Sequence, residues 1–122
     1  MSWLYERFSV MSDTGEIVTA TREFGQWTVR FPRAIQTSAY TNAMWADAFY
    51  KVNDMQSPEV LILGLGGGGA VKELHQKFHD CRLTAVERDS AMLQIARCLS
   101  LWSPYPAPEC VHADAKEFLS RT

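Results

Sequence analysis

A glycine-rich segment is the part of the 122-residue sequence whose residue types and spacing most clearly indicate chemistry. Residues 64–69 read GLGGGG, fit the pattern G-x-G-x-x-G, and lie between an apolar run at residues 60–63 and a helical pattern that begins near Ala70. Glycines at such a junction let the chain turn sharply, and they let a ligand approach the backbone beside the free N–H groups of a helix N-terminus. A tight turn alone would need fewer of them, because each glycine costs about 0.5 to 1 kcal/mol relative to alanine. We therefore expect this loop to bind a nucleotide-like cofactor.

Two acidic residues follow the next two apolar runs and are candidates to hold the same cofactor. Glu87 lies 23 positions after Gly64 (87 − 64 = 23), close to the offset of about 20 residues at which an acidic side chain binds the hydroxyls of a ribose. The alternative for Glu87 is a solvated carboxylate at the end of a strand. Asp114 could accept a hydrogen bond from an adenine amino group or cap the helix that follows it, and these two roles are compatible.

The elements that would position these residues alternate between strand and helix from residue 59 onward. Strands are expected at residues 60–63, 83–86 and 110–112, the first of them buried on both faces, with helices between them where apolar residues recur at helical spacing. A last short helix would follow Asp114, with Glu117 three positions on as in a capping box. This β-α-β-α-β-α alternation predicts an α/β fold: the first half of a Rossmann-like, doubly wound parallel sheet with about three parallel strands.

The first 55 residues have a different pattern. β-branched and aromatic residues alternate in runs up to residue 32 and are separated by turn residues, which predicts a small antiparallel meander beginning with a β-hairpin. Met44, Trp45 and Phe49 then fall at helical spacing, which predicts an amphipathic helix with Thr41 as its N-cap. We therefore divide the chain into a β-meander with a gate helix, residues 1–55, and a partial Rossmann-like cofactor-binding domain, residues 56–122.

Composition narrows the classes of partner and compartment. Twelve Lys and Arg residues against fourteen Asp and Glu residues give a formal charge of −2, so no basic surplus indicates nucleic acid or an anionic membrane as a partner. No apolar run approaches the roughly 18 to 20 residues that cross a bilayer, and the first residues lack the pattern of a secretory signal, so we expect a cytoplasmic protein. His75 and His79 have no Cys or carboxylate at ligand spacing, so no metal site is expected.

Three segments together resemble the spermidine synthase-like family within the S-adenosylmethionine-dependent methyltransferase superfamily. They read LILGLGGG at residues 61–68, VERD at residues 86–89 and HADAKEF at residues 112–118, and they look like the first three strand ends of that family. Upstream, the segments FG at residues 24–25 and IQTS at residues 35–38, with the aromatic Trp45, are similar to the hairpin and gate segment of polyamine synthases. The resemblance covers residues 15–119 but not the whole family fold.

The resemblance implies a site for S-adenosylmethionine or its decarboxylated form. The glycine loop would wrap the methionine part, Glu87 would bind the ribose, Asp114 would bind the adenine amino group, and Gln36 would lie over the donor. Arg88 stands where the family has an apolar residue beside adenine, and a guanidinium can stack on such a ring. The candidate cofactor-binding residues are Gln36, Gly64, Leu65, Gly66, Gly67, Gly68, Glu87, Arg88, Asp114 and Ala115.

Departures from the synthase pattern favour methyl transfer from intact S-adenosylmethionine over aminopropyl transfer. Gly67 stands where synthases usually have an Asp, and Thr41-Asn42 and Trp45-Ala46 replace an Asp-Glu and a Tyr-His pair, so the usual anchors for polyamine amines are missing. The predicted function is therefore a transferase acting on a small-molecule substrate, by methyl or aminopropyl transfer. Two alternatives remain open: part of a nicotinamide dinucleotide-binding oxidoreductase, and a non-catalytic oligomerising or ligand-binding remnant.

The 67 residues from Gln56 onward leave room for about two βαβ steps of roughly 30 residues each. We expect the catalytic half of such a transferase to be missing, so no catalytic residue is predicted. In a doubly wound sheet the first strand is central, and without later strands beside it residues 60–63 would have an open edge. We therefore expect a homo-oligomer, a dimer in which a second copy covers that edge.

Overall fold

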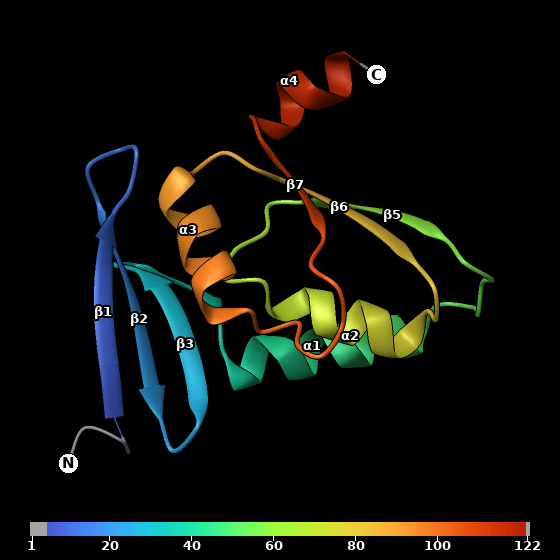
Figure 1. Cartoon of the computed structure of the whole chain (residues 1–122), viewed down its shortest axis with the longest axis horizontal. Coiled ribbons are helices and arrows are strands. Elements are labelled where there is room, and N and C mark those ends of the chain that lie inside the picture. Colours follow the sequence, from blue (N-terminus) through green and yellow to red (C-terminus); the bar gives the residue numbers. More distant parts are fainter. Residues whose placement is uncertain (1–4, 122) are drawn as a thin grey trace.

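The structure, a computed structural model, describes residues 5–121. Figure 1 shows an antiparallel sheet on one side of the molecule and a parallel sheet with its helices on the other. The antiparallel sheet contains, in chain order, β1 (Tyr5–Met11), β2 (Ile17–Glu23), β3 (Gln26–Phe31) and β4 (Ala34–Thr37). The parallel sheet contains, also in chain order, β5 (Glu59–Leu63), β6 (Arg82–Glu87) and β7 (Glu109–His112). The helices are α1 (Ala39–Tyr50), α2 (Gly69–Lys77), α3 (Ser90–Leu99) and α4 (Ala115–Ser120). The expected α/β fold with three parallel strands is confirmed.

The N-terminal strands form the meander that the sequence predicts, with one addition. The turn between β2 and β3 consists of Phe24 and Gly25, both at positive φ (50° and 83°), which is the geometry that a two-residue hairpin favours. The addition is β4, which pairs with β3 across a register shift between Val29 and Arg30. This fourth strand ends at Thr37, so it carries Gln36 and Thr37 directly to the start of α1.

The inner face of the antiparallel sheet packs against α3. Val18, Ala20 and Val29 from the sheet meet Met92 and Ile95 from the helix, and none of the five side chains is more than 1% exposed. Burial of this completeness contributes roughly 1.5 to 3 kcal/mol for each large aliphatic side chain. This hydrophobic cluster therefore contains residues from both sides of the division at residue 55. The division into two domains stays a prediction.

Strand β5 is covered by the core on only one face and is paired along only one edge. Val60 and Ile62 point toward the core under α2, whereas Leu61 and Leu63 are 41% and 49% exposed. The expectation that this strand is buried on both faces is wrong, because Leu61 and Leu63 on its second face are largely exposed. Its outer edge is also open, since β6 pairs with one side of it and no described strand pairs with the other. The strand has the alternating burial of a half-covered edge strand, and the expected open edge is present.

Helix α1 differs from its prediction in two ways. Its N-cap is Ser38 and not Thr41; Thr41 occupies the N3 position and completes a capping box with Ser38. The expected amphipathic helix also does not bury an apolar face, because none of its residues is buried. Its large apolar and aromatic side chains are mostly exposed, namely those of Tyr40, Met44, Trp45 and Tyr50. It packs beside α2 (Figure 1) and leaves an apolar surface uncovered.

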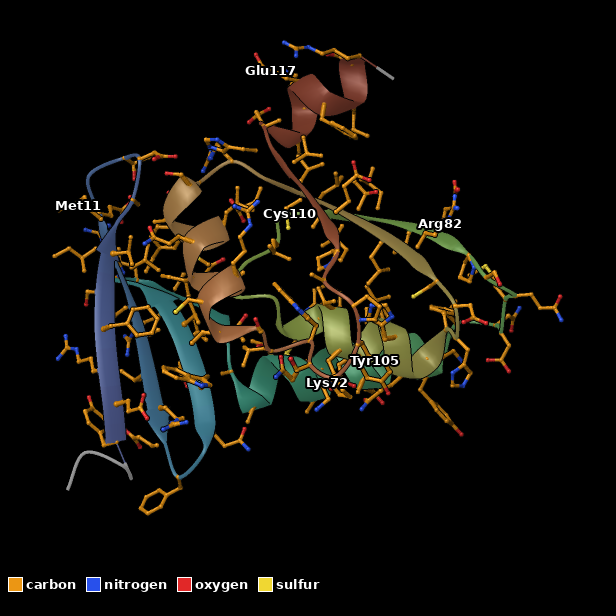
Figure 2. All side chains as sticks on the ribbon, in the orientation of Figure 1. Met11, Lys72, Arg82, Tyr105, Cys110 and Glu117 are labelled. Atoms are coloured by element: carbon orange, nitrogen blue, oxygen red, sulfur yellow. The ribbon has the colours of Figure 1, made fainter. Side chains whose placement is uncertain are left out.

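The loop between α3 and β7 packs against α2 through contacts with His75. Tyr105 lies beside α2 (Figure 2), and its ring stacks on that of His75 with 5.1 Å between ring centroids. His75 Nε2 lies 3.2 Å from the carbonyl oxygen of Pro106 and fixes the same loop. None of the helices within residues 5–121 is both long and apolar enough to cross a bilayer.

Candidate functional site

The glycine loop between β5 and α2 has the backbone geometry that the sequence predicts. Gly64, Gly66 and Gly68 have φ values of 88°, 58° and 90°, a region that costs residues with a Cβ roughly 1 to 2 kcal/mol. At Gly64 no atom lies within 4 Å of the place where a Cβ would stand. The space beside Gly64 is therefore open, as a loop that meets a ligand through its main chain requires.

The later glycines of the loop are required for a different reason, because a side chain there would collide with neighbouring protein atoms. A Cβ on Gly67 would lie 2.8 Å from both Thr37 Oγ1 and Val29 Cγ2, and a Cβ on Gly69 would collide with Asn42 Oδ1. The amide of Gly67 also donates a hydrogen bond to Thr37 Oγ1 at 3.0 Å. These glycines let the antiparallel sheet and α1 pack directly on the loop, so their contacts are with protein.

Glu87 lies at the mouth of the loop. Its Oε1 accepts hydrogen bonds from the amides of Leu65 at 3.1 Å and Gly66 at 3.3 Å, and its Oε2 accepts one from the amide of Asp89 at 2.9 Å. A carboxylate has about four acceptor positions, so the half-buried Glu87 retains acceptor capacity toward a ligand. The strand end and the glycine loop, 23 positions apart in sequence (87 − 64 = 23), thus meet through one side chain.

A cavity of about 450 Å³ lies between α1, β5 and the glycine loop, within the range of roughly 300 to 1,000 Å³ typical of small-molecule sites. Gln36, Gly64, Leu65, Gly66 and Glu87 line it, so five of the predicted cofactor residues are brought together. A neighbouring hollow of about 390 Å³ is lined by Arg88 together with the same Gln36 and Glu87. Gln36 and Glu87 therefore stand between two adjoining spaces.

The remaining predicted residues line neither of these two spaces. Gly67 and Gly68 are buried, Gly67 against Thr37 and Gly68 against Trp102. Asp114 and Ala115 lie after β7, where Asp114 Oδ1 accepts hydrogen bonds from the amides of Lys116 at 2.9 Å and Glu117 at 3.2 Å. The helix-capping role of Asp114 is confirmed, and its role toward adenine stays a prediction.

Three residues of the cavity wall were not among the predicted cofactor-binding residues, although the resemblance placed them in the gate segment. Thr37 holds the glycine loop, and Asn42 and Trp45 extend the wall along α1. Asn42 Oδ1 is a buried acceptor, and it has no hydrogen-bond partner among the described residues. Helical spacing placed Trp45 on a helix, but spacing alone could not show that Thr37 at the end of β4 and Asn42 on α1 lie against the glycine loop.

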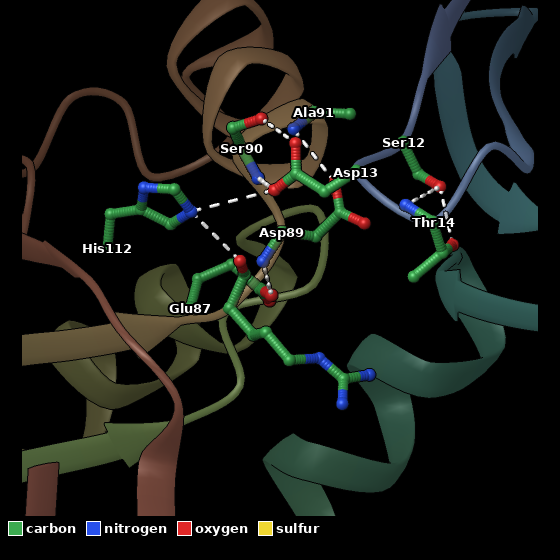
Figure 3. A network of polar contacts seen from close by, with 9 residues as sticks. Ser12, Asp13, Thr14, Glu87, Asp89, Ser90, Ala91 and His112 are labelled. Atoms are coloured by element: carbon green, nitrogen blue, oxygen red, sulfur yellow. Dashed lines mark hydrogen bonds and ion pairs between the residues drawn. The ribbon is translucent and has the colours of Figure 1, made fainter. Parts of the chain in front are cut away.

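A polar network fastens the tip of the first hairpin beside this site (Figure 3). Asp13 accepts hydrogen bonds from the amide and the hydroxyl of Ser90 at the start of α3, and its Oδ2 lies 3.6 Å from His112 Nε2. Hydrogen bonding to the Ser90 side chain and backbone is the main cause that lowers the pKa of Asp13 from its ordinary value of 3.8, and His112 adds to it. The network joins residues 13, 90 and 112, and His112 Nε2 also lies 2.9 Å from the carbonyl oxygen of Arg88, the residue directly after Glu87.

The residues present fit an adenosyl cofactor. The open side of Gly64 gives main-chain access, and Glu87 provides a carboxylate at the same mouth. The buried, unpartnered Asn42 Oδ1 offers an acceptor for a donor group of a bound molecule. The first two features match the needs of a nucleoside with ribose hydroxyls, and Asn42 Oδ1 remains for a donor group of a second molecule.

Known structures share this architecture. A probable spermidine synthase from Corynebacterium glutamicum superimposes with a TM-score of 0.71 at 15% identity, over 91% of this chain and 46% of that chain. The spermidine synthase from Thermotoga maritima gives a TM-score of 0.66 at 21% identity, over 93% of this chain and 43% of that chain. A further spermidine synthase, solved in complex with the transition state analogue AdoDATO, gives 0.66 at 21% identity, over 93% of this chain and 41% of that chain.

The chain has part of the spermidine synthase fold. It spans less than half the length of each of these three spermidine synthases. No family model matches the chain. Two curated relatives, the eEF1A lysine and N-terminal methyltransferase homologs of Drosophila melanogaster and Drosophila pseudoobscura pseudoobscura, are each 50% identical to it over 38 residues, which is 31% of this chain and 6% of either relative. The structural match to spermidine synthases and the sequence match to methyltransferase homologs thus confirm the resemblance that the sequence indicated.

Proposed function

We propose that the chain is the cofactor-binding part of an S-adenosylmethionine-dependent methyltransferase. The observation that carries this proposal is the position of Glu87, whose carboxylate is hydrogen-bonded to the glycine loop and lines the cavity at the open side of Gly64. With three of its acceptor positions occupied by backbone amides, this carboxylate can still accept a hydrogen bond from a ribose hydroxyl. The shared fold of the spermidine synthases and the local match to a methyltransferase support the same class.

The residues of the chain would act by binding and orientation. When bound, S-adenosylmethionine supplies a methyl group activated by a sulfonium. Glu87 would hold the ribose, Gln36 and the main chain around Gly64 would confine the donor, and Asp114 and Arg88 would flank the adenine. Because orienting two reactants can supply roughly 7 to 11 kcal/mol of a barrier, no protein nucleophile is needed for this transfer.

Methyl transfer is favoured over aminopropyl transfer by the charge of the cavity. Aminopropyl transfer in a spermidine synthase uses a polyamine, and a polycation removed from water needs several carboxylates. Glu87 is the one ionisable side chain among the described residues that line the 450 Å³ cavity. The 38-residue match is to a protein named as a lysine and N-terminal methyltransferase, which supports the same choice.

Calorimetric titration tests the cofactor class. We expect S-adenosylmethionine to bind with measurable heat and NAD to give none. The variant Glu87→Gln should weaken S-adenosylmethionine binding about tenfold or more, because hydrogen bonds to a charged acceptor contribute roughly 1.5 to 3 kcal/mol. Glu109→Gln is the matched control, since Glu109 is an exposed carboxylate on β7 that lines neither of the two adjoining spaces.

The thermal melting of Glu87→Gln must be measured beside its affinity, because Glu87 also fastens the loop. Gln36→Ala provides a second probe that leaves the hydrogen bonds of the loop intact, and it should also weaken binding. Flat titrations with every adenosyl donor and well-folded protein would refute the proposal. Tighter binding of NAD would instead favour the oxidoreductase alternative.

We also propose that a second copy of the chain covers the free edge of β5. No described strand pairs with the outer backbone edge of β5, and Glu59 at its start is paired with Arg82 at 3.5 Å, so two copies related by a two-fold axis bring no unpaired charge together there. Light scattering should show a dimer, and Ile62→Pro, which places a ring without an N–H donor in the strand, should give a monomer. A monomeric wild-type chain at high concentration would contradict this. A cytoplasmic location stays a prediction.

A further inference from the structure

The cavity beside the glycine loop has an almost uncharged wall. Of the described residues that line it, Glu87 alone is ionisable. Its carboxylate accepts hydrogen bonds from three backbone amides, those of Leu65, Gly66 and Asp89. These amide dipoles already compensate much of its charge, so the wall offers little negative potential to a bound cation.

The two aspartates on and after α1 are each paired with a lysine. Asp47 on α1 is paired with Lys51 at 3.3 Å. Asp54, in the segment between α1 and β5, is paired with Lys77 at 3.0 Å. Neither aspartate lines the cavity. The α1 side of the cavity therefore brings no free anion to the wall.

The same wall is rich in apolar and aromatic surface. Trp45 and Phe49 stack with 5.5 Å between ring centroids and an interplanar angle of 20°, and both line the cavity. Leu61 and Leu63 line it from β5. Trp45 is 46% exposed, so part of its surface is free for contact with a bound group.

One neutral polar atom completes the wall. Asn42 Oδ1 is buried and has no partner among the described residues, next to the N-terminus of α2. A buried acceptor without a donor costs roughly 1 to 3 kcal/mol. An N–H or O–H group of a bound molecule would satisfy it.

We propose that this wall selects the acceptor substrate: a molecule or side chain with an apolar or aromatic body, at most one positive charge, and a single N–H or O–H donor directed at Asn42. The inference rests on the proposed transferase function. Each ammonium group taken from water must meet an anion or an aromatic face, and this wall supplies faces but no second carboxylate. Polyamines bring a second ammonium group for which the described wall has no second carboxylate, so they are expected to bind more weakly than monoamines.

Amines matched in length but not in charge test the proposal. Benzylamine, n-butylamine and putrescine are titrated into the full chain saturated with S-adenosylhomocysteine, and binding is followed by the indole N–H signal of Trp45 in NMR spectra, assigned through Trp45→Phe. Benzylamine and n-butylamine should shift this signal. Putrescine, which is butylamine with a second ammonium group, should bind at least tenfold more weakly.

Variants that add a carboxylate should reverse the preference. Asn42→Asp and, independently, Leu63→Asp place a negative charge in the wall, and each should tighten putrescine binding at least tenfold relative to n-butylamine. Leu63→Asp keeps the test valid if Asn42→Asp fails to fold. Ala46→Asp is the matched control, because Ala46 is exposed on α1 and does not line the cavity.

Three outcomes would overturn the proposal: putrescine binding the wild type as tightly as n-butylamine, no amine shifting the Trp45 signal, or the control Ala46→Asp giving the same gain as the wall variants. The proposed function fails separately, through the absence of S-adenosylmethionine binding in the calorimetric titration. A chain that binds the donor but shows any of these three outcomes retains its proposed function and loses only this acceptor specificity.

Discussion

The two sides of the glycine loop differ sharply in how completely they are packed. On one side, Val29 of the antiparallel sheet is fully buried with Met92 of α3 and touches the loop at Gly67. On the other side, Leu63 of β5 and Trp45 of α1 are about half exposed around a cavity. The packed side holds the loop in one conformation, and the open side leaves its main chain accessible.

The two sides of the loop therefore have different roles: one keeps the loop rigid, and the other leaves room for a ligand. A main-chain site needs a loop that does not move, because each misplaced amide loses its hydrogen bond to a ligand. Packing of the antiparallel sheet against the loop supplies that rigidity, and the cost is a row of glycines where side chains would collide. The open side can then be apolar and incomplete without loosening the site.

The largest expected effect comes from the packed side. Met92→Ala should lower the free energy of unfolding by about 2 to 5 kcal/mol, because it removes a fully buried side chain and leaves a cavity. Leu61→Ala, on the open side, should cost about 1 kcal/mol or less. Urea unfolding of both variants checks the contrast, and equal losses would show that the two sides are packed alike in solution.

A second comparison lies within the loop itself. Gly67→Ala should lower stability by about 1 to 3 kcal/mol, because its Cβ would overlap Thr37 and Val29. Gly64→Ala meets no atom and should cost only the roughly 1 to 2 kcal/mol of its positive φ. Gly64→Ala should weaken S-adenosylmethionine binding more than it weakens the fold. Thermal melting and calorimetry together separate the two effects, and a harmless Gly67→Ala would refute the close packing.

The smallest effect concerns the hairpin tip that Asp13 attaches to α3. Because the pKa of Asp13 is lowered below 3.8 in the folded chain, its stabilising contribution is present above that pH and is lost as the pH falls through the folded value. NMR titration of the Asp13 carboxyl should give a pKa below 3.8. The unfolding curves of wild type and Asp13→Asn should differ near neutral pH and converge in acid, while Glu16→Gln in the same turn serves as control. A pKa of 3.8 or above would contradict the network.

Much of the fold followed from the sequence. Turn residues and alternating apolar residues predicted the meander, and the strand-glycine-helix order predicted the parallel sheet, because these signals are local. One error is local: the N-cap of α1 is Ser38, and Thr41 is the N3 residue of the same capping box. The other concerns longer-range packing, since β5 is not buried on both faces. The candidate site was found in part, since Glu87 was expected near Gly64, whereas Thr37 and Asn42 were not expected to touch the loop.

Residue types and spacing by themselves determined that a loop free of side chains would follow a parallel strand and that a carboxylate at the next strand end would lie beside it. Parallel strands place their carboxyl ends at one edge, so this result needs no knowledge of the rest of the chain. Only the tertiary structure decided which glycines face open space and which face Thr37, Val29 and Asn42. The choice depends on how β4 and α1 lie against the loop, and that arrangement is set by the shared core of the antiparallel sheet and α3, whose contacts join residues more than 60 positions apart (92 − 29 = 63).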